Sequence, residues 1–459
     1  MMGGLAGATR ADRVDDYLKS EMAERHIPGL TVAVVQNDKV VKLQGYGMAD
    51  LEASAPATPA TVYMLASMSK QFTAAGIMLL VQDGKVGLDD AAGKYLGGRP
   101  KAWRGVTVRQ LLNQTSGIPE WNPDSNKDPL LKTYTPAEIS ERAAARPPAF
   151  MPGTRYEYSN TNYNLLAGII EKVSGTSYGD FLHARIFGPL DMNATGVYDP
   201  MEIVANRAAG YVRSGGKLFN NALVYDPSLL AGAGGLQATA GDLVKWDAAL
   251  AAGTVLPASS LAQMWTPPAL PGGAHTDYGM GWIAQTYNGH RLIWHNGALP
   301  GAMGFLGRFP DDRLTVILLS NMSPLDGFDD AYPFLPLGQG VAALYASALA
   351  PAKGAAVVPV RRAGPPIDAL LRAVSDQFAR GSLDRSPFTP ALGAALSPAA
   401  VAQVRSLLAP LGKMTALTLT RVTPDGSALY RAVYGEAVVD WLIAVDRNGK
   451  ITGLRLLPG

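Results

Sequence analysis

One segment of this sequence must lie at the centre of the fold. The stretch ASMSKQFTAAGIMLL, residues 66–80, is apolar on nearly every side of a helix, and the pattern continues through Val81 to a stop at Gly84. A helix without a polar face has to be covered by other elements all round. Lys70 nevertheless stands in its first turn, where burying an ammonium group is costly.

Strand-like runs stand at both ends of the first 350 residues, with helical periodicity between them. An amphipathic helix is expected over residues 14–25, followed by two β-rich runs within 27–50 around a turn at 36–38. From about 106 to 265 the periodicity is mainly helical, with stops at Gly117, Gly153 and Gly175. Further strand-like runs cover residues 281–289, 290–297, 301–309 and 314–322. The pattern predicts an α/β unit interrupted by a helical one.

The composition changes near residue 350, where an Ala- and Pro-rich stretch without periodicity is typical of a linker. We expect a first domain over residues 1–350, a linker over 351–366 and a second domain over 367–459. The second domain has two helical stretches, 368–380 and 397–411, and then four strand-like runs. Strong hairpin signals, Pro424-Asp425-Gly426 and Asn448-Gly449, separate strands of this small α+β domain.

The composition also narrows the classes of function. Forty Lys and Arg residues nearly balance 38 Asp and Glu residues and are scattered, so the chain lacks the basic footprint of a nucleic-acid-binding protein. There is no cysteine, which excludes disulfides, thiolate nucleophiles and cysteine metal sites. The five histidines show no metal-ligand spacing, so we expect no metal and no cofactor. No run reaches the ~18 apolar residues of a membrane span, and the first residues lack the apolar stretch of a secretory signal.

Three serine motifs compete for the role of nucleophile. Ser67 and Ser214 each begin an S-x-x-K motif, and Ser177 lies in a G-x-S-x-G sequence. An S-x-x-K pair works only on a helix, where residues three apart share a face, and the two glycines before Lys217 predict a turn instead. The G-x-S-x-G elbow needs a preceding strand, whereas residues 161–175 have helical spacing. Ser177 is therefore better interpreted as a helix cap, which leaves Ser67.

Ser67 and Lys70 suit nucleophilic catalysis assisted by a general base. Partial burial disfavours the ammonium and lowers the pKa of Lys70, so the neutral amine can accept the Ser67 proton. The helix N-terminus adds positive potential that favours an oxyanion near Ser67. The alternative is structural: Ser67 caps the helix and Lys70 extends to solvent. This segment alone favours neither interpretation.

Tyr158-Ser159-Asn160 is the only Y-x-N motif, in a loop just before the helix expected from residue 161. A phenol flanked by cations can share its proton, and an amide can both donate to and accept from an amide substrate. The alternative is that Asn160 caps the helix beside a packed tyrosine.

His295-Asn296-Gly297 is the only H-x-G motif, at the end of a predicted strand. A glycine at this point lets a substrate lie against the strand, and the next backbone N–H, of Ala298, can point at a carbonyl oxygen. The alternative is a turn between strands with an incidental histidine.

In the order S-x-x-K, Y-x-N and H-x-G, the three motifs resemble those of the class C β-lactamase and penicillin-binding protein family of serine hydrolases, including its esterase and D-aminopeptidase relatives. The segments VTVRQLLNQTSGIP, FGPLDMNATG and AGAGGLQATAGDLVKW also look like recurring family segments. The resemblance covers about residues 14–347. It implies a β-lactamase/transpeptidase-like α/β (α+β) fold, in which a mostly antiparallel sheet flanked by helices adjoins a helical domain and the site lies between them.

The resemblance implies catalytic roles for the first two motifs. Ser67 would be the acylated nucleophile, Lys70 its base partner and Tyr158 a proton relay in acylation and deacylation. Asn160 would hydrogen-bond the substrate amide or fix Lys70. The expected substrate is a small ester, amide or peptide-like molecule.

The third motif departs from the family pattern. The resemblance implies that His295, Asn296 and Gly297 line the substrate edge, and that the N–H groups of Ser67 and Ala298 form an oxyanion hole. In β-lactamases the motif is usually Lys-Thr-Gly, whose cation helps hold a substrate carboxylate, whereas an unperturbed histidine with a pKa of about 6.5 is mostly neutral at pH 7. We therefore expect weak binding of penicillin-like carboxylates and a preference for esters or amides. The alternatives are a β-lactamase, or a penicillin-binding or sensor protein that acylates with little turnover.

The block from residue 367 resembles, less specifically, the cone-shaped nuclear transport factor 2-like domains. A lipocalin-like barrel is the second choice, because the strands are too few to close one. No constellation of reactive residues stands in this block, so we expect a role in packing, in pairing of copies as a homo-oligomer, or in covering the active-site mouth. The family resemblance also implies a periplasmic or extracellular location.

Overall fold

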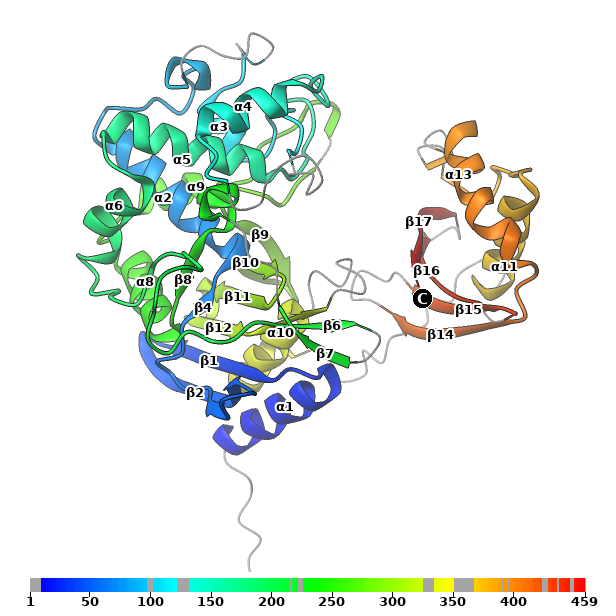
Figure 1. Cartoon of the computed structure of the whole chain (residues 1–459), viewed down its shortest axis with the longest axis horizontal. Coiled ribbons are helices and arrows are strands. Elements are labelled where there is room, and N and C mark those ends of the chain that lie inside the picture. Colours follow the sequence, from blue (N-terminus) through cyan, green and yellow to red (C-terminus); the bar gives the residue numbers. More distant parts are fainter. Residues whose placement is uncertain are drawn as a thin grey trace, which may run out of the picture. The chain divides into compact units, whose positions relative to one another are not determined.

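The computed structural model contains two compact units, Met1–Pro351 and Ala352–Gly459 (Figure 1). It describes residues 10–96, 103, 105–121, 132–214, 217–221, 226–273, 275–324, 334–350, 367–389, 392–393, 396–422, 428–435, 437–445 and 450–458. The predicted linker at 351–366 and the two predicted hairpin turns of the second domain lie outside these residues.

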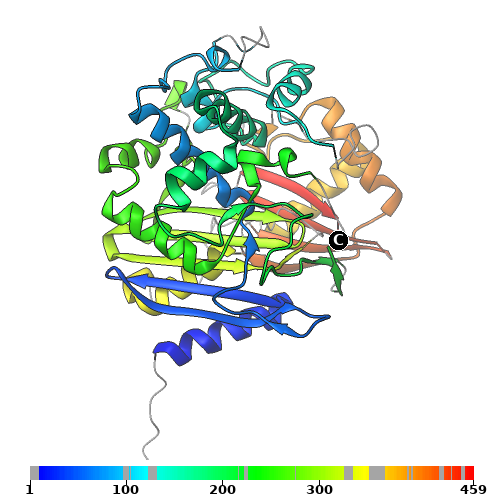
Figure 2. The ribbon, with the colours of Figure 1, turned by 60° about the vertical axis from the view of Figure 1, so that its left-hand side comes forward.

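A seven-stranded antiparallel sheet forms the centre of the first unit (Figures 1 and 2). Its order is β3-β2-β1-β12-β11-β10-β9, so β1 near the start of the chain pairs with β12, which lies far along the sequence (for instance Leu30 with Ser320). The strands are β1 (Gly29–Gln36), β2 (Lys39–Asp50), β3 (Ala55–Pro56), β9 (Ile283–Tyr287), β10 (His290–Leu299), β11 (Ala302–Phe309) and β12 (Leu314–Ser320). All the strand-like runs predicted for this unit are therefore strands of one sheet.

Helices cover both faces of this sheet, which explains why β12 is buried along its whole length. Val316 and Leu318 pack with α1 (Arg10–Arg25) and α10 (Phe334–Tyr345) on one face. Ile317 and Leu319 belong to the cluster on the other face, with α2 (Lys70–Gln82) and α8 (Ala240–Ala252). A strand that is mostly apolar on both sides is the expected signature of a sheet covered on both faces.

The remaining helices of the first unit gather around α2, which Figure 2 shows on the opposite side of the sheet from α1. They are α3 (Val108–Leu112), α4 (Pro136–Ala144), α5 (Asn160–Ser174), α6 (Tyr178–Leu182), α7 (Ala231–Gly234) and α9 (Ala258–Met264). Two small sheets, β4-β8-β5 and β13-β6-β7, complete the described part of the unit. Their strands are β4 (Tyr63–Met64), β5 (Gly196–Val197), β6 (Tyr211–Ser214), β7 (Lys217–Asn220), β8 (Leu236–Ala238) and β13 (Met322–Pro324).

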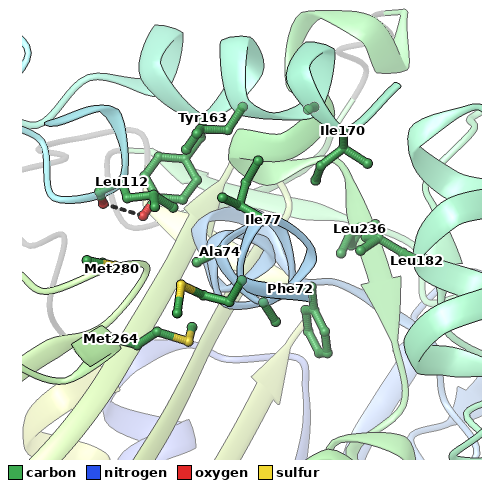
Figure 3. Packing of buried hydrophobic residues seen from close by; sticks show 14 of the residues in the cluster. Phe72, Ala74, Ile77, Leu112, Tyr163, Ile170, Leu182, Leu236, Met264 and Met280 are labelled. Atoms are coloured by element: carbon green, nitrogen blue, oxygen red, sulfur yellow. Dashed lines mark hydrogen bonds between the residues drawn. The ribbon is translucent and has the colours of Figure 1, made fainter. Parts of the chain in front are cut away.

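Helix α2 is buried on all sides, as its sequence predicts (Figure 3). Phe72 lies 5.4 Å from Phe187 and 4.8 Å from Trp246, measured between ring centroids. On another side, Tyr163 of α5 is fully buried and donates its hydroxyl hydrogen to the Leu112 carbonyl oxygen at 2.6 Å. The predicted central helix is therefore confirmed.

Local backbone geometry matches the predicted turns. Asn37 and Asp38 have φ values of 52° and 61°, the left-handed pair that a tight hairpin between β1 and β2 requires. Gly175 ends α5 with φ of 76°, as expected for a helix C-cap. Residues Pro310–Asp312 form a 3-10 turn between β11 and β12.

The second unit contains a four-stranded antiparallel sheet in the order β14-β15-β16-β17. Its elements are α11 (Ile367–Arg380), α13 (Pro398–Leu408), β14 (Ala416–Val422), β15 (Ala428–Tyr434), β16 (Ala437–Val445) and β17 (Ile451–Pro458). Trp441 is buried between sheet and helices and donates to the Tyr434 hydroxyl at 3.1 Å, so it is a core residue, as a tryptophan in an alternating strand predicts. The resemblance to nuclear transport factor 2-like domains stays a prediction.

Among the described helices, none is both long and apolar enough to cross a membrane.

A buried ion pair joins α8 to the sheet. Arg308 of β11 contacts the Asp247 carboxylate at 2.7 Å, with side-chain exposures of 10% and 5%, and Thr315 of β12 donates to the same carboxylate at 2.9 Å. Such a pair holds its site in one arrangement, because either partner left alone would be an uncompensated buried charge.

We expect Asp247→Ala to lower the free energy of unfolding by about 3–5 kcal/mol, because it strands the Arg308 charge. The matched control is Asp89→Asn, which removes the exposed pair with Arg109 and should cost less than about 1 kcal/mol. Denaturant unfolding of the full chain measures both. Equal effects of the two substitutions would contradict this account of the buried pair.

Candidate active site

Ser67 lies on a sharply bent segment between β4 and α2. Residues Ala66–Ser69 form a single 3-10 turn, and Ala66 has a φ of 48°, unusual for a residue other than glycine. The sequence predicted that Ser67 would stand on the helix itself, but α2 begins only at Lys70. The 3-10 turn still places Ser67 and Lys70 within reach of each other, and Lys70 Nζ lies 3.1 Å from Ser67 Oγ.

The structural alternative for this segment is wrong. Lys70 is fully buried and does not reach solvent, and Ser67 makes no cap, because Ser69 is the residue before α2. The Ser67 hydroxyl is instead held between Lys70 and Tyr158.

The contacts of Lys70 fit a neutral amine. Its Nζ lies 2.7 Å from Asn160 Oδ1 and 2.6 Å from the Ala233 carbonyl oxygen, and both of these atoms can only accept. A neutral amine has two hydrogens for these two oxygens and one lone pair, which is left for the Ser67 hydroxyl. Burial lowers the pKa of Lys70 to about 7, and the negative charge of Glu120 acts in the opposite direction. The expected lowering of this pKa is confirmed.

Tyr158 lies on the other side of the nucleophile. Its hydroxyl donates to Ser67 Oγ at 2.9 Å, and its ring centre lies 4.8 Å from Lys70 Nζ. Burial of the hydroxyl end raises the pKa of Tyr158 well above its usual value, even though the residue as a whole is 36% exposed. The sequence suggested a phenol that can give up or share its proton, and in the structure the Tyr158 hydroxyl is a hydrogen-bond donor to Ser67 Oγ.

Glu120 is part of the site, and the sequence analysis missed it. Its carboxylate accepts from Asn160 Nδ2 at 2.9 Å, from Ser159 Oγ at 2.9 Å and from the Thr161 N–H at 3.2 Å. These groups form the N-terminus of α5, where a negative charge is favourable. By taking the Asn160 amino group, Glu120 turns the amide oxygen of Asn160 toward Lys70. The only signal in the sequence was an acidic residue directly after the family-like segment ending at Pro119.

His295 is 1% exposed, so its side chain is buried, and its expected place at the substrate edge stays a prediction. Its Nδ1 donates to the Asn296 carbonyl oxygen at 2.6 Å, so Nε2 accepts from the Tyr278 hydroxyl at 3.1 Å. Burial, together with the nearby Lys70, lowers the pKa of His295 to about 3, which confirms the prediction that it is neutral at pH 7. Tyr278 in turn packs edge-on against Tyr158, with ring centroids 5.8 Å apart. His295 therefore supports the aromatic wall of the site.

Gly297 is needed for close packing between the third motif and the nucleophile segment. A Cβ atom at Gly297 would lie 2.1 Å from the Leu65 carbonyl oxygen and 3.1 Å from the Ala66 Cβ. Strand β10 can therefore run directly beside the turn that carries Ser67. Asn296 and Ala298, on either side of Gly297, are partly exposed.

The two rejected serines have structural roles. Ser177 Oγ accepts from the Asp180 N–H at 3.1 Å and caps α6, directly after α5. Ser214 ends β6 and pairs with Lys217, the first residue of β7, so this S-x-x-K motif spans a hairpin, with residues 215–216 outside the described part. Within the described residues, no three His, Asp or Glu side chains gather as a metal site would require.

Residues 14–335 match the protein family described as Beta-lactamase. Penicillin-binding protein 4* of Bacillus subtilis (strain 168) is 33% identical over 321 residues, which cover 65% of this chain and 69% of that protein. Protein flp of Staphylococcus aureus (strain NCTC 8325 / PS 47) is 28% identical over 340 residues, which cover 68% of this chain and 63% of flp.

Solved structures share the fold. The D-amino acid amidase from Ochrobactrum anthropi SV3, complexed with L-phenylalanine, has a TM-score of 0.65 at 27% identity, over 73% of this chain and 99% of the amidase. The octameric penicillin-binding protein homologue from Pyrococcus abyssi has a TM-score of 0.64 at 24% identity and covers 98% of this chain and 99% of its own, a likeness in fold. With the arrangement of Ser67, Lys70 and Tyr158, these matches lead to one conclusion: the chain belongs to the beta-lactamase family of serine hydrolases.

Proposed function

We propose that this protein hydrolyses ester or amide bonds through an acyl-enzyme on Ser67, with Lys70 as the base. One observation carries the proposal: both N–H bonds of a neutral Lys70 have acceptors, in Asn160 and Ala233, so its lone pair faces the Ser67 hydroxyl. A base needs both reach and a pKa near the working pH, and Lys70 has both.

Acylation then needs three proton movements. Lys70 Nζ takes the hydroxyl proton while Ser67 Oγ attacks the substrate carbonyl carbon. Tyr158, 2.9 Å from Oγ, gives its proton to the leaving oxygen or nitrogen as the carbonyl re-forms, and Lys70 returns a proton to Tyr158. In deacylation, a water molecule attacks the acyl carbonyl carbon with the same set of proton transfers and frees Ser67. The N–H groups of Ser67 and Ala298 are the proposed oxyanion hole, with Asn160 and Asn296 beside the substrate.

The charges around the site favour substrates without a carboxylate at the third motif. His295 is neutral and buried, so it supplies no cation where β-lactamases have their lysine. Glu120 adds negative charge beside Lys70, and Tyr156, Tyr158 and Tyr278 form an aromatic wall. These features suit an uncharged ester or an aminoacyl amide. The name of one structural neighbour, D-amino acid amidase, indicates a substrate of the second kind. A β-lactamase, or a penicillin-binding protein that acylates with little turnover, is the alternative.

The family resemblance supports two further proposals. We propose a periplasmic or extracellular location, in keeping with the penicillin-binding relatives. We also propose that the second unit pairs copies of the chain. The octameric assembly of one structural neighbour supports this proposal.

Ser67→Ala should lower ester and amide hydrolysis by at least about 10⁴-fold, because it removes the attacking oxygen. The panel for the wild type consists of p-nitrophenyl esters, D- and L-aminoacyl anilides and nitrocefin, with intact-mass measurement of trapped acyl groups. The matched control, Ser177→Ala, should retain activity. If nitrocefin is hydrolysed far faster than every ester and anilide, the result would support the β-lactamase alternative. A single stoichiometric mass gain without turnover would support a penicillin-binding or sensor protein.

The pH dependence should follow Lys70. Since only the neutral amine accepts the Ser67 proton, kcat/KM should rise with pH through about 7, the lowered pKa of Lys70. Tyr158 should add no falling limb below about pH 10, because its pKa is raised. Initial rates over a pH series measure the profile, and a profile that is flat between about pH 5.5 and 8.5 would contradict a titrating Lys70 base.

Glu120→Gln should move that midpoint to lower pH and also reduce kcat. The substitution removes the charge that raises the pKa of Lys70, and it lets the Asn160 amide rotate away. Glu141→Gln, on the exposed face of α4, is the control and should leave the midpoint unchanged. A loss of activity with an unshifted midpoint would mean that Glu120 acts only on the stability of the α5 terminus.

A further inference from the structure

A cavity of about 490 Å³, separate from the proposed catalytic site, lies in the helical part of the first unit. It is bounded by α4, α5, α6, β5 and the segment that leads into α7, and none of the residues of the proposed catalytic site lines it. Apolar side chains such as Ile139, Phe187 and Val197 form much of its wall. Its volume falls within the range of small-molecule sites, about 300–1,000 Å³.

A buried polar atom in this wall lacks a partner. Asn164 is 4% exposed, and its Nδ2 donates to the Leu229 carbonyl oxygen at 3.0 Å, which fixes the orientation of the amide. Its Oδ1 then has no hydrogen-bond partner among the residues that the structure describes. Buried acceptors are normally satisfied, so the cavity presents one specific demand to an occupant, a hydrogen-bond donor aimed at Asn164.

The charged residues at the cavity select against anions. Two carboxylates, those of Glu171 and Asp180, line it beside His183, and no Lys or Arg is among its described lining residues. A carboxylate or phosphate would meet like charges there without a compensating cation. The cavity therefore suits a neutral or cationic molecule.

Two walls of the cavity are bonded to the segments that hold Lys70. Tyr178 donates its hydroxyl hydrogen to Thr73 Oγ1 at 2.7 Å, and Thr73, which follows Lys70 by one turn of α2, donates to the Gly232 carbonyl oxygen at 2.6 Å. Ala231, which lines the cavity, begins α7, and the Ala233 carbonyl of the same turn accepts from Lys70 at 2.6 Å.

We propose that this cavity is a second ligand site, for a neutral or cationic small molecule that combines an apolar ring with a hydrogen-bond donor directed at Asn164 Oδ1. Through Tyr178 and the α7 turn, its occupancy also alters how Lys70 is held and thereby the rate of hydrolysis. This regulatory part rests on the proposed function, whereas the binding part does not.

Binding is tested with indole on the full chain carrying Ser67→Ala, so that hydrolysis plays no part. Calorimetric titration should show one saturable site. 1-Methylindole, which lacks the N–H donor, should bind at least about tenfold more weakly, and indole-3-carboxylate should be excluded by its charge. No saturable binding of indole, as when water alone fills the cavity, or equal binding of the methylated probe, would overturn the site.

Gly196→Leu provides a variant that fills the cavity. Gly196 lines it, and a Cβ atom there would meet no atom within 4 Å, so a side chain can be introduced at this position. The variant should lose indole binding, while Gly105→Leu, at an exposed glycine with equally open surroundings, should keep it. Intermolecular NOEs from indole to the Val197 methyl groups locate the probe without any change to the cavity. Binding that Gly196→Leu leaves intact, or NOEs elsewhere only, would contradict the assignment.

Regulation is tested on the wild-type chain. Saturating indole should change kcat for a p-nitrophenyl ester by about fivefold, and Gly196→Leu should abolish this response. Binding without a change in rate would remove the regulatory part and leave the site. A wild-type chain that hydrolyses no substrate would refute the proposed function, and the titrations on Ser67→Ala would still decide the ligand site.

Discussion

The removal of the Lys70 amine from water is the constraint on which the active site depends. Burying an amine is unfavourable unless its hydrogens find acceptors, and here these are Asn160 Oδ1 and the Ala233 carbonyl oxygen, 90 and 163 positions further along the chain. Helices α2, α5 and α7 must therefore pack together before Lys70 can be buried. Once they have, the lone pair of the neutral amine has only Ser67 left to face. The geometry of the base thus follows from satisfying its hydrogen bonds.

Much of this fold can be predicted from the sequence, because local patterns report burial directly. Helix α2 has no polar face and is buried on every side, and β12 is mostly apolar and buried throughout because helices cover both faces of the sheet. The hairpin turn at Asn37 and Asp38 is equally local, since it needs two residues that tolerate a left-handed backbone. Ser67 could be selected over Ser177 and Ser214 for the same reason. The residues before Ser177 predict a helix, and the two glycines after Ser214 predict a turn.

The parts of the site that escaped prediction depend on contacts between distant segments. Glu120 meets Asn160 across 40 positions, and apart from its place directly after Pro119 nothing in its neighbourhood distinguishes it from a solvated carboxylate. The burial of His295 likewise involves a partner from another segment, because its ring contacts the Tyr278 hydroxyl, 17 positions earlier. Periodicity reports which side of an element is buried. Periodicity does not report which groups of another segment will contact that buried side. These contacts decide both the charge of His295 and the orientation of the Asn160 amide.

The backbone, more than any side chain, fixes the nucleophile relative to the strand beside it. Gly297 allows β10 to approach the Leu65 carbonyl so closely that a Cβ atom at this position would clash with the carbonyl oxygen. On the other side of this contact, Ala66 adopts an uncommon positive φ. Main-chain positions shift less readily than rotamers, because moving them disturbs the hydrogen bonds of the whole strand. The two N–H groups proposed as the oxyanion hole, those of Ser67 and Ala298, belong to these two main-chain segments. The position of Lys70 is easier to adjust, since its acceptor at Ala233 belongs to a turn of only four residues, Ala231–Gly234. The first residue of this turn also lines the cavity that contains Asn164 in its wall.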